Sequence, residues 1–239
     1  MIIIGHRGAA GIEPENTIAS IEAAVKVGVD MIEFDLRVTK DNKLVVFHDA
    51  NLLRMAGLNK NIDEMTLKEI NTTVMHSGHP VPTFLEAMDA AGEIPVLIDC
   101  KGKNWAALLN EELKKHKGPT PAVTAIDTYE MFRFHEFRPD VETYVSELTR
   151  PFEAIYKARL LGFTGISLNF WVLSPLAYFY AKRHKLKFMI FTVNRPFFAR
   201  FLHLLYPQAV IITNVPHKLA PLSKRRLARR QSDRAKGSA

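Results

Sequence analysis

The 239-residue chain is long enough for one large domain, and 47% of its residues are hydrophobic, so it can bury a substantial core. Its single cysteine, Cys100, excludes an internal disulfide, and no apolar run reaches the length of a membrane span. The formal charge of +7 is concentrated at the end of the chain. Residues 217–239 hold eight Lys and Arg against one acidic residue, Asp233, so the basic character belongs to this tail and not to the domain.

The first elements are a strand, a helix and a second strand. Residues 2–4 are all isoleucine and predict a strand, which leads into the segment Gly5-His6-Arg7-Gly8. A helix is predicted to begin at a cap formed by Asn16-Thr17, because its apolar residues then repeat at helical spacing up to Gly28. The second strand is predicted over residues 29–39.

Beyond an irregular segment, the chain alternates regularly between helices and strands. Residues 50–81 read as an insertion with one short helix near residues 66–70. Helices are then predicted at 84–91, 105–115, 129–137, 152–161, 175–184 and 196–206, and strands at 96–101, 122–126, 142–146, 165–168, 187–193 and 209–213. Together with the first two strands this gives eight β units that alternate with helices. The pattern predicts an α/β fold, a TIM (β/α)8 barrel, over residues 1–216.

Two carboxylates in the second strand form a candidate metal site. The stretch from Met31 to Val38 alternates and is rich in β-formers, so Glu33 and Asp35 are predicted to point to the same face. A hard divalent cation such as magnesium or calcium would relieve their mutual repulsion. The alternative is an outward, solvated strand face. The apolar residues Ile32 and Phe34 argue against it, because they would occupy the face toward the helices.

The end of the second strand is predicted to be one arm of a hairpin. Residues 40–43 (KDNK) are a turn signal between two apolar runs, 34–38 and 44–48. If the turn centres on Asp41 and Asn42, antiparallel register sets Asp35 opposite His48. The second histidine of the region then lies beside the carboxylates. His6 arrives separately, from the end of the first strand.

The ordered set of short motifs resembles the glycerophosphodiester phosphodiesterase family, within the PLC-like phosphodiesterase superfamily. The segments are HRG at 6–8, PENT at 14–17, IEFD at 32–35 and VVFHD at 45–49, followed by PTFLEA at 82–87, IDCK at 98–101 and FTVN at 191–194. No single tetrapeptide is specific, but their order is. The resemblance covers residues 1–216, and it implies a barrel with its insertion over the C-terminal face.

The resemblance also implies roles for individual residues. Glu33, Asp35 and Asp99 would hold one divalent cation, Mg²⁺, Ca²⁺ or Mn²⁺. His6 and His48 would be the general acid and base, with the assignment between them open. Four further residues follow by the same resemblance: Arg7 and Lys101 as phosphate contacts, and Glu15 and Asn16 as supports of His6 or the metal.

Three positions depart from the pattern of the resembled family. Asp99 stands where glutamate is usual, so the carboxylate is shorter by one methylene and its metal contact becomes less direct. Phe191 replaces the usual tryptophan and Asn214 the usual aspartate, and both are expected to be peripheral to the site. The departures keep open the alternative of a non-catalytic barrel that binds membranes or phosphorylated ligands.

The expected reaction is hydrolysis of a glycerophosphodiester to an alcohol and glycerol 3-phosphate, with a lysophospholipase D-type reaction on lysolipids as the alternative. No signal peptide is recognised, so the expected location is the cytoplasm. The tail, residues 217–239, is expected to be a disordered segment, with an anionic membrane surface as its alternative partner. No motif supports sequence-specific nucleic-acid binding. The aromatic stretch 170–173 and Phe197 are compatible with either core packing or membrane contact.

Overall fold

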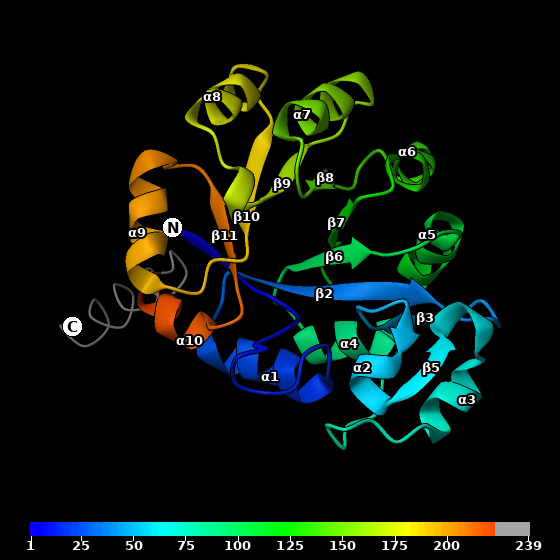
Figure 1. Ribbon diagram of the computed structural model, residues 1–239. Helices are drawn as coiled ribbons and strands as arrows, with labels where there is room; N and C mark the ends of the chain where they lie inside the picture. The colour runs from blue at the N-terminus through cyan, green and yellow to red at the C-terminus, as the bar shows by residue number, and fades with distance from the viewer. Residues whose placement is uncertain (223–239) are drawn as a thin grey trace, which may run out of the picture.

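The computed structural model describes residues 1–222 and shows a closed barrel of parallel strands (Figure 1). The barrel strands in order around the ring are β1 (Ile2–Gly5), β2 (Met31–Val38), β6 (Val96–Cys100), β7 (Ala122–Ala125), β8 (Thr143–Glu147), β9 (Gly165–Asn169), β10 (Lys187–Phe191) and β11 (Val210–Thr213). The ring closes because β1 pairs with both β2 and β11. The predicted TIM barrel is confirmed. One more strand, β3 (Leu44–Val46), pairs antiparallel with β2.

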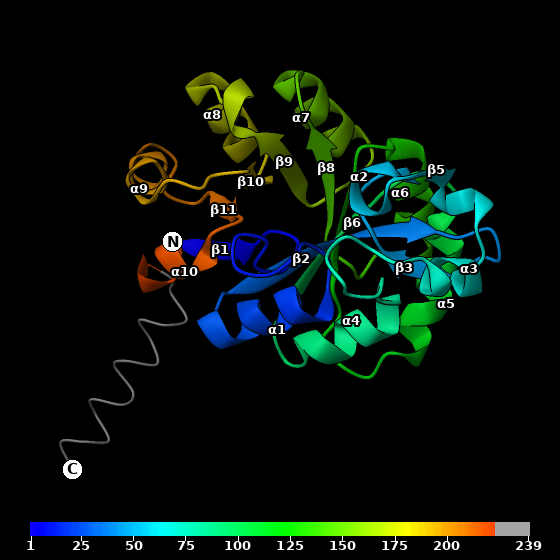
Figure 2. The same cartoon turned by 60° about the horizontal axis from the view of Figure 1, so that its bottom comes forward.

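Helices surround the barrel and follow the predicted positions to within one or two residues (Figures 1 and 2). They are α1 (Ile18–Val27), α4 (Phe84–Ala91), α5 (Trp105–Lys115), α6 (Thr128–Phe137), α7 (Pro151–Leu160), α8 (Pro175–Arg183) and α9 (Pro196–Leu205). The short helix α10 (Pro216–Leu219) is not among the predicted elements. The caps explain the agreement. Thr17 caps α1 by accepting from the Ser20 backbone, and Gly28 ends it in a left-handed conformation.

Strand alternation divides the core into two parts. Ile32, Phe34 and Leu36 are fully buried in the layer between barrel and helices. The opposite face of the strands points into the barrel, where a layer of apolar side chains fills the interior: Ile4, Leu97, Ala122, Tyr144, Met189 and Ile212. The side chains of Glu33 and Asp35 therefore lie on the interior face.

The hairpin exists, but its predicted register is wrong by one residue. Asn42 adopts a left-handed φ of 57°, so the loop contains three residues and is closed by Thr39. The centre of the turn consequently moves to the single residue Asp41. Asp35 faces Phe47, whose backbone N–H donates to the Asp35 carbonyl at 3.1 Å. His48 lies one residue beyond the predicted pair.

The insertion contains more regular structure than the single helix that the sequence predicts. Its elements are β4 (Asn51–Leu52), α2 (Leu53–Ala56), β5 (Leu58–Asn61), the 3₁₀ turn η1 (Ile62–Glu64) and α3 (Leu67–Thr72). The strands β4 and β5 pair with each other, and the insertion packs a small core of its own against Val45 and Phe47 at the hairpin arm. Figure 1 shows it at one side of the barrel, beside β3.

The predicted tail begins within the described part of the chain. Helix α10 and the 3₁₀ turn η3 (Ala220–Leu222) follow β11, and Leu219 and Ala220 are buried. The rest of the tail, residues 223–239, lies outside the described residues. Among residues 1–222, no helix combines the length and the apolar character that a membrane span requires.

Gly8 and Gly28 have nearly equal φ values but differ in how closely other atoms approach them. Substituting each by alanine therefore distinguishes the effect of backbone conformation on stability from the effect of close packing. A Cβ on Gly8 (φ +80°) would lie 2.5 Å from the Ser20 backbone, whereas one on Gly28 (φ +78°) meets nothing within 4 Å. We expect Gly28→Ala to lower the free energy of unfolding by about 1 kcal/mol, from the left-handed conformation alone. Gly8→Ala should cost about 3 kcal/mol, because crowding against α1 is added. Urea unfolding measures both, and equal losses would contradict this account of the turn.

Candidate active site

A cavity of 280 Å³ opens at the C-terminal ends of the barrel strands. All seven residues predicted to bind metal, act on protons or contact phosphate line it: His6, Arg7, Glu33, Asp35, His48, Asp99 and Lys101. They come from the ends of β1, β2 and β6 and from the chain after β3. The barrel thus brings together residues that are separated by almost a hundred positions in the sequence.

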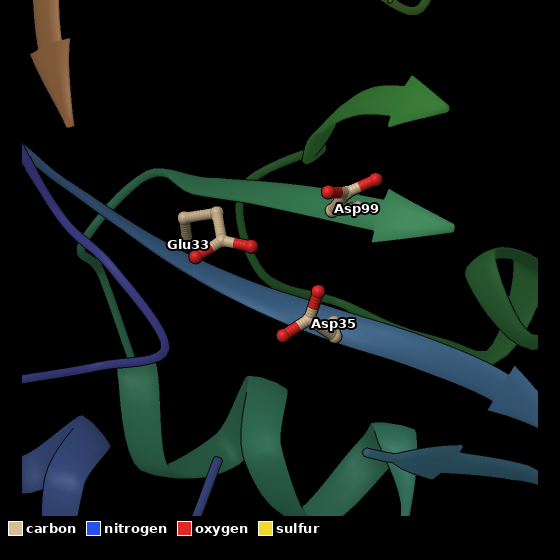
Figure 3. A group of neighbouring side chains, drawn as sticks. All are labelled: Glu33, Asp35 and Asp99. Carbon is tan, nitrogen blue, oxygen red and sulfur yellow. The ribbon is translucent and has the colours of Figure 1, made fainter. Parts of the chain in front are cut away.

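Three carboxylates form the centre of this cavity. Asp35 and Asp99 are register partners across the β2–β6 ladder, and Glu33 lies two residues earlier on the same face. One oxygen from each lies within 4.8 Å of the others. Figure 3 shows the three side chains directed toward a common space. Asp99 reaches this space although it is one methylene shorter than glutamate.

The cluster is electrostatically strained because its members are like charges out of water. Burial and then Asp35 raise the pKa of Glu33 well above its ordinary value. Burial also raises the pKa of Asp99, although Lys101 opposes this. Burial acts in the same direction on Asp35, but Lys101 and Arg7 outweigh it and hold its pKa below the usual value.

The two cations contact the cluster directly. The Lys101 ammonium lies 2.5 Å from an oxygen of Asp99 and 3.3 Å from one of Asp35. The Arg7 guanidinium lies 3.3 Å from Asp35 and donates to Glu15 at 2.7 Å. Burial by itself would lower the pKa of Lys101, but Asp99 and Asp35 raise it overall, so Lys101 stays charged.

His6 is held between the first two strands and the last one. Its Nε2 lies 3.8 Å from Glu33, and its Nδ1 is 2.5 Å from the side-chain oxygen of Asn214, directly after β11. Because an amide oxygen only accepts hydrogen bonds, Nδ1 carries the proton and Nε2 is the free base. Burial and the charge of Arg7 lower the pKa of His6 to about 4.

His48 is anchored from the opposite side, by the insertion. Its Nδ1 bonds to Asp49 at 2.7 Å, and Asp49 in turn accepts from Arg54 of helix α2 at 2.7 Å. Arg54 also donates to Glu15 at 2.6 Å. The histidine is thus tied to Arg7 through a continuous chain of charged hydrogen bonds, which fixes its position at the cavity.

The two predicted supporting residues have different partners. The Asn16 amide donates to Asp35 at 2.8 Å, and its carbonyl accepts from the Asp35 backbone at 3.2 Å, so it orients one carboxylate of the cluster. Glu15 contacts neither His6 nor the cluster. It bridges Arg7 and Arg54 instead.

The chain matches a known protein family over most of its length. The model of the glycerophosphoryl diester phosphodiesterase family matches residues 6–159, which include every residue of the cluster and both histidines. The chain belongs to this family.

Two relatives illustrate the range of this phosphodiesterase family. Lysophospholipase D GDPD1 of Rattus norvegicus is 35% identical over 129 residues, which are 48% of this chain and 41% of the relative. A glycerophosphodiester phosphodiesterase of Bacillus subtilis is 29% identical over 170 residues, 60% of this chain and 58% of the relative. The chain therefore spans about half the length of these relatives.

Solved structures share the fold of this family member over nearly its whole length. The structure of a phosphodiesterase of Oleispira antarctica in complex with the product sn-glycerol-3-phosphate aligns with a TM-score of 0.85 and 22% identity. The alignment covers 93% of this chain and 97% of the other. At this identity the likeness shows the barrel fold.

The cluster fits the divalent cation that the family implies. Its donors are all carboxylate oxygens, the ligands that hard cations prefer. One oxygen of Asp99 is buried without a hydrogen-bond partner among the described residues, although a carboxylate oxygen so placed normally has one. Two positive side chains stand against three carboxylates, a formal charge of −1, so a divalent cation bound here would change it to +1 and relieve the repulsion among the carboxylates.

Both substituted positions predicted to be peripheral reach the site. Asn214 bonds to His6, and Phe191 lines the cavity. The reason is that the barrel closes: β11 lies next to β1, so a residue just after it meets His6. The sequence shows that Asn214 replaces the usual aspartate, but it does not show that this residue contacts His6.

Several further functional residues have only a weak sequence signal. Arg54 lies in the insertion, where no motif marks it. Three buried hydroxyl side chains line the sector of the cavity formed by β7 to β9, which begins directly beside Asp99: Thr124, Ser146 and Ser167. Thr124 is the single polar residue of β7, which is a local signal for an inward-facing site position, whereas the strands of Ser146 and Ser167 contain other polar residues as well.

The bond between Asn214 and His6 is expected to fix the imidazole tautomer. In Asn214→Ala, His6 loses its Nδ1 acceptor, so both tautomers become populated and the rate of phosphodiester hydrolysis should fall roughly 10- to 100-fold. The ¹⁵N signals of the imidazole and kcat together measure this. Asn214→Asp keeps an acceptor and should keep the Nδ1–H form, and the signals of His48 should not move in either variant. An unchanged His6 tautomer in Asn214→Ala would refute the role of this bond.

Proposed function

We propose that the protein is a metal-dependent phosphodiesterase that hydrolyses glycerophosphodiesters to an alcohol and glycerol 3-phosphate. The observation that carries the proposal is a single cavity in which a buried three-carboxylate cluster, two anchored histidines and two cations converge. Membership of the family and the named activity of the Bacillus subtilis relative support it.

Each group in the cavity matches one requirement of phosphodiester hydrolysis. A divalent cation on Glu33, Asp35 and Asp99 would neutralise charge on the phosphate oxygens. Mg²⁺ and Ca²⁺ suit these oxygen donors best, and Mn²⁺ is the third choice. Arg7 and Lys101 add positive charge for the same oxygens.

The two histidines move the protons. One removes a proton from the attacking hydroxyl, which belongs to the glycerol 2-position or to water, and the other donates one to the leaving alcohol. Both rings are held at Nδ1, by Asn214 and by Asp49, which leaves each Nε2 for proton transfer. A general acid and a general base both need imidazole rings of fixed orientation, and the bonds at Nδ1 prevent the two rings from rotating.

The hydroxyl side of the cavity suits the glycerol moiety. Thr124 lies beside Asp99 on the neighbouring strand, and Ser146 and Ser167 follow on the next two strands around the barrel mouth. The Thr124 hydroxyl has no hydrogen-bond partner among the described residues. Hydroxyl groups both donate and accept, so they match a polyol. This side of the cavity would hold the glycerol while the alcohol leaves toward the solvent.

We propose that the enzyme is located in the cytoplasm and acts there on water-soluble diesters. The Lys and Arg side chains of the basic tail would bind a fraction of the enzyme molecules to an anionic membrane surface.

The first test is release of glycerol 3-phosphate from glycerophosphocholine and glycerophosphoethanolamine, with added divalent metals and with chelator. We expect metal-dependent release, and a loss of roughly 10²- to 10⁴-fold in His6→Ala, because an acid or base is removed. His184→Ala, at the end of α8 and away from the cavity, is the matched control and should retain the rate.

Glu33→Ala separates the metal from the histidines. Metal titration should show one tight divalent site in the native chain and in His6→Ala, and none in Glu33→Ala. Stoichiometric metal binding without any hydrolysis, by protein shown to be folded, would favour a non-catalytic binder over the enzyme.

A second candidate, a lysophospholipase D-type reaction, is favoured by the apolar mouth of the cavity. Ile126 and Leu148 line the cavity and are 54% and 48% exposed. Apolar side chains in that position would contact the hydrocarbon part of a lysolipid. The rat relative is named for this activity.

Polar substitution at the mouth distinguishes the two substrates. We expect Ile126→Asn/Leu148→Asn to lower kcat/KM roughly tenfold for lysophosphatidylcholine, and less for glycerophosphocholine, because only the lysolipid has a chain to bury. Val74→Asn/Leu160→Asn removes two exposed apolar side chains elsewhere and is the control. Equal losses for both substrates would argue against the lipid candidate.

A further inference from the structure

Helix α9 presents an apolar stripe to the outside of the molecule. Its barrel-facing residues, Ala199 and Leu202, are buried as expected. Phe197, Phe201 and Leu204, spaced at i, i+4 and i+7, are 83%, 47% and 79% exposed. The outer face of a surface helix is normally charged or polar. Here the large apolar side chains lie on a face that no residue of 1–222 covers.

The stripe continues into an aromatic cluster at the C-terminal end of the barrel. The 3₁₀ turn η2 (Phe170–Val172) follows β9, and Trp171 within it is 81% exposed. Phe170 contacts both Trp171 and Phe198, with ring centroids 4.5 Å and 5.8 Å apart. We call Phe170, Trp171, Phe197, Phe198 and Phe201 the aromatic rim.

The rim borders the candidate active site. Trp171, Phe197 and Phe198 line an apolar hollow of 600 Å³, and Thr192 lines both this hollow and the active-site cavity. The rim and the mouth of the barrel therefore open on the same end of the molecule. Exposed aromatic side chains gathered at one end mark an interaction surface and not scattered surface residues.

The charge around the rim has one sign. The sequence contains no Asp or Glu between Glu153 and Asp233, so α8 and α9, which are neighbours in Figure 1, have no acidic residue. Arg195, at the start of α9, lines the hollow, and Arg200 is exposed one turn later. The surface combines exposed aromatic rings with arginine.

We propose that the aromatic rim docks the protein on an anionic phospholipid bilayer. Aromatic side chains favour the interfacial region of a bilayer, and nearby Lys and Arg are attracted to anionic headgroups. A second copy of the chain fits the surface less well. A symmetric dimer would set its cations against each other without a carboxylate to pair them. The residues after 222 hold seven Lys and Arg against the single acidic Asp233, so their net charge has the same sign as that of the rim.

This orientation turns the active site toward the lipid surface. The catalytic cavity and the rim share the C-terminal end, so docking through the rim holds the cavity at the headgroup layer. Docking itself needs no catalysis, and the proposal can fail or succeed independently of the hydrolytic function.

Trp171 is a natural reporter of docking. The chain has two tryptophans, and the other one, Trp105, is fully buried. On adding vesicles of phosphatidylcholine and phosphatidylglycerol in equal amounts, we expect the emission to shift to shorter wavelength and to be quenched by brominated lipid. Phosphatidylcholine vesicles alone should produce a much smaller change. Trp171→Phe should abolish the shift, because Trp105 does not reach the surface. Binding through the tail alone would leave the Trp171 emission unchanged.

Vesicle co-sedimentation of the full chain measures how much the rim contributes. Trp171→Ala/Phe197→Ala should weaken partitioning onto the anionic vesicles on the order of tenfold, because two exposed aromatic side chains no longer insert. Tyr129→Ala/Leu160→Ala removes side chains that are 70% and 66% exposed on α6 and α7, and should bind as the native chain does.

Three outcomes would overturn the proposal. They are equal partitioning of the native chain and the rim variant, absence of a Trp171 emission change at saturating vesicle, and concentration-dependent dimerisation that the rim variant loses. The last result would make the rim a contact between copies of the chain.

Discussion

The arrangement of this protein depends on the mutual repulsion of Glu33, Asp35 and Asp99, which lie within 4.8 Å of one another at the end of the barrel. Buried like charges persist only where other groups compensate them. Arg7 and Lys101 supply part of the compensation, while burial and then Asp35 raise the pKa of Glu33. The same imbalance that would destabilise an ordinary core is what makes the site suited to a divalent cation and to a phosphate.

The two histidines are positioned by two different features of the fold, the closure of the barrel and the insertion. His6 depends on closure of the barrel, because its partner Asn214 follows the last strand. His48 depends on the insertion, because Arg54 of α2 holds the Asp49 carboxylate to which His48 bonds. Loss of either partner, Asn214 or Asp49, would free one imidazole to rotate without removing a carboxylate of the cluster. Rigid positioning of catalytic groups by surrounding hydrogen bonds is a general requirement of such sites.

The C-terminal end of the barrel is chemically divided. Carboxylates and cations occupy the sector of β1, β2 and β6, hydroxyl groups the sector of β7 to β9, and aromatic side chains the outside beyond β9 and β10. This division gives a path from an apolar surface to a polar cavity over a short distance. It suits a phosphodiester whose leaving group ranges from a soluble alcohol to a lipid, and it makes the outer aromatic side chains part of the same functional end.

The sequence by itself determined the alternation of strands and helices, the helix ends at Thr17 and Gly28, and the shared face of Glu33 and Asp35, because these depend on local periodicity and caps. The family motifs also brought together the histidines, carboxylates and cations that line the cavity. Only the tertiary structure decided the hairpin register, since a left-handed Asn42 changed the loop length by one residue. It alone placed Asn214 beside His6 and Arg54 beside Asp49, because those contacts join segments whose proximity comes from barrel closure and insertion packing, and no local pattern encodes them.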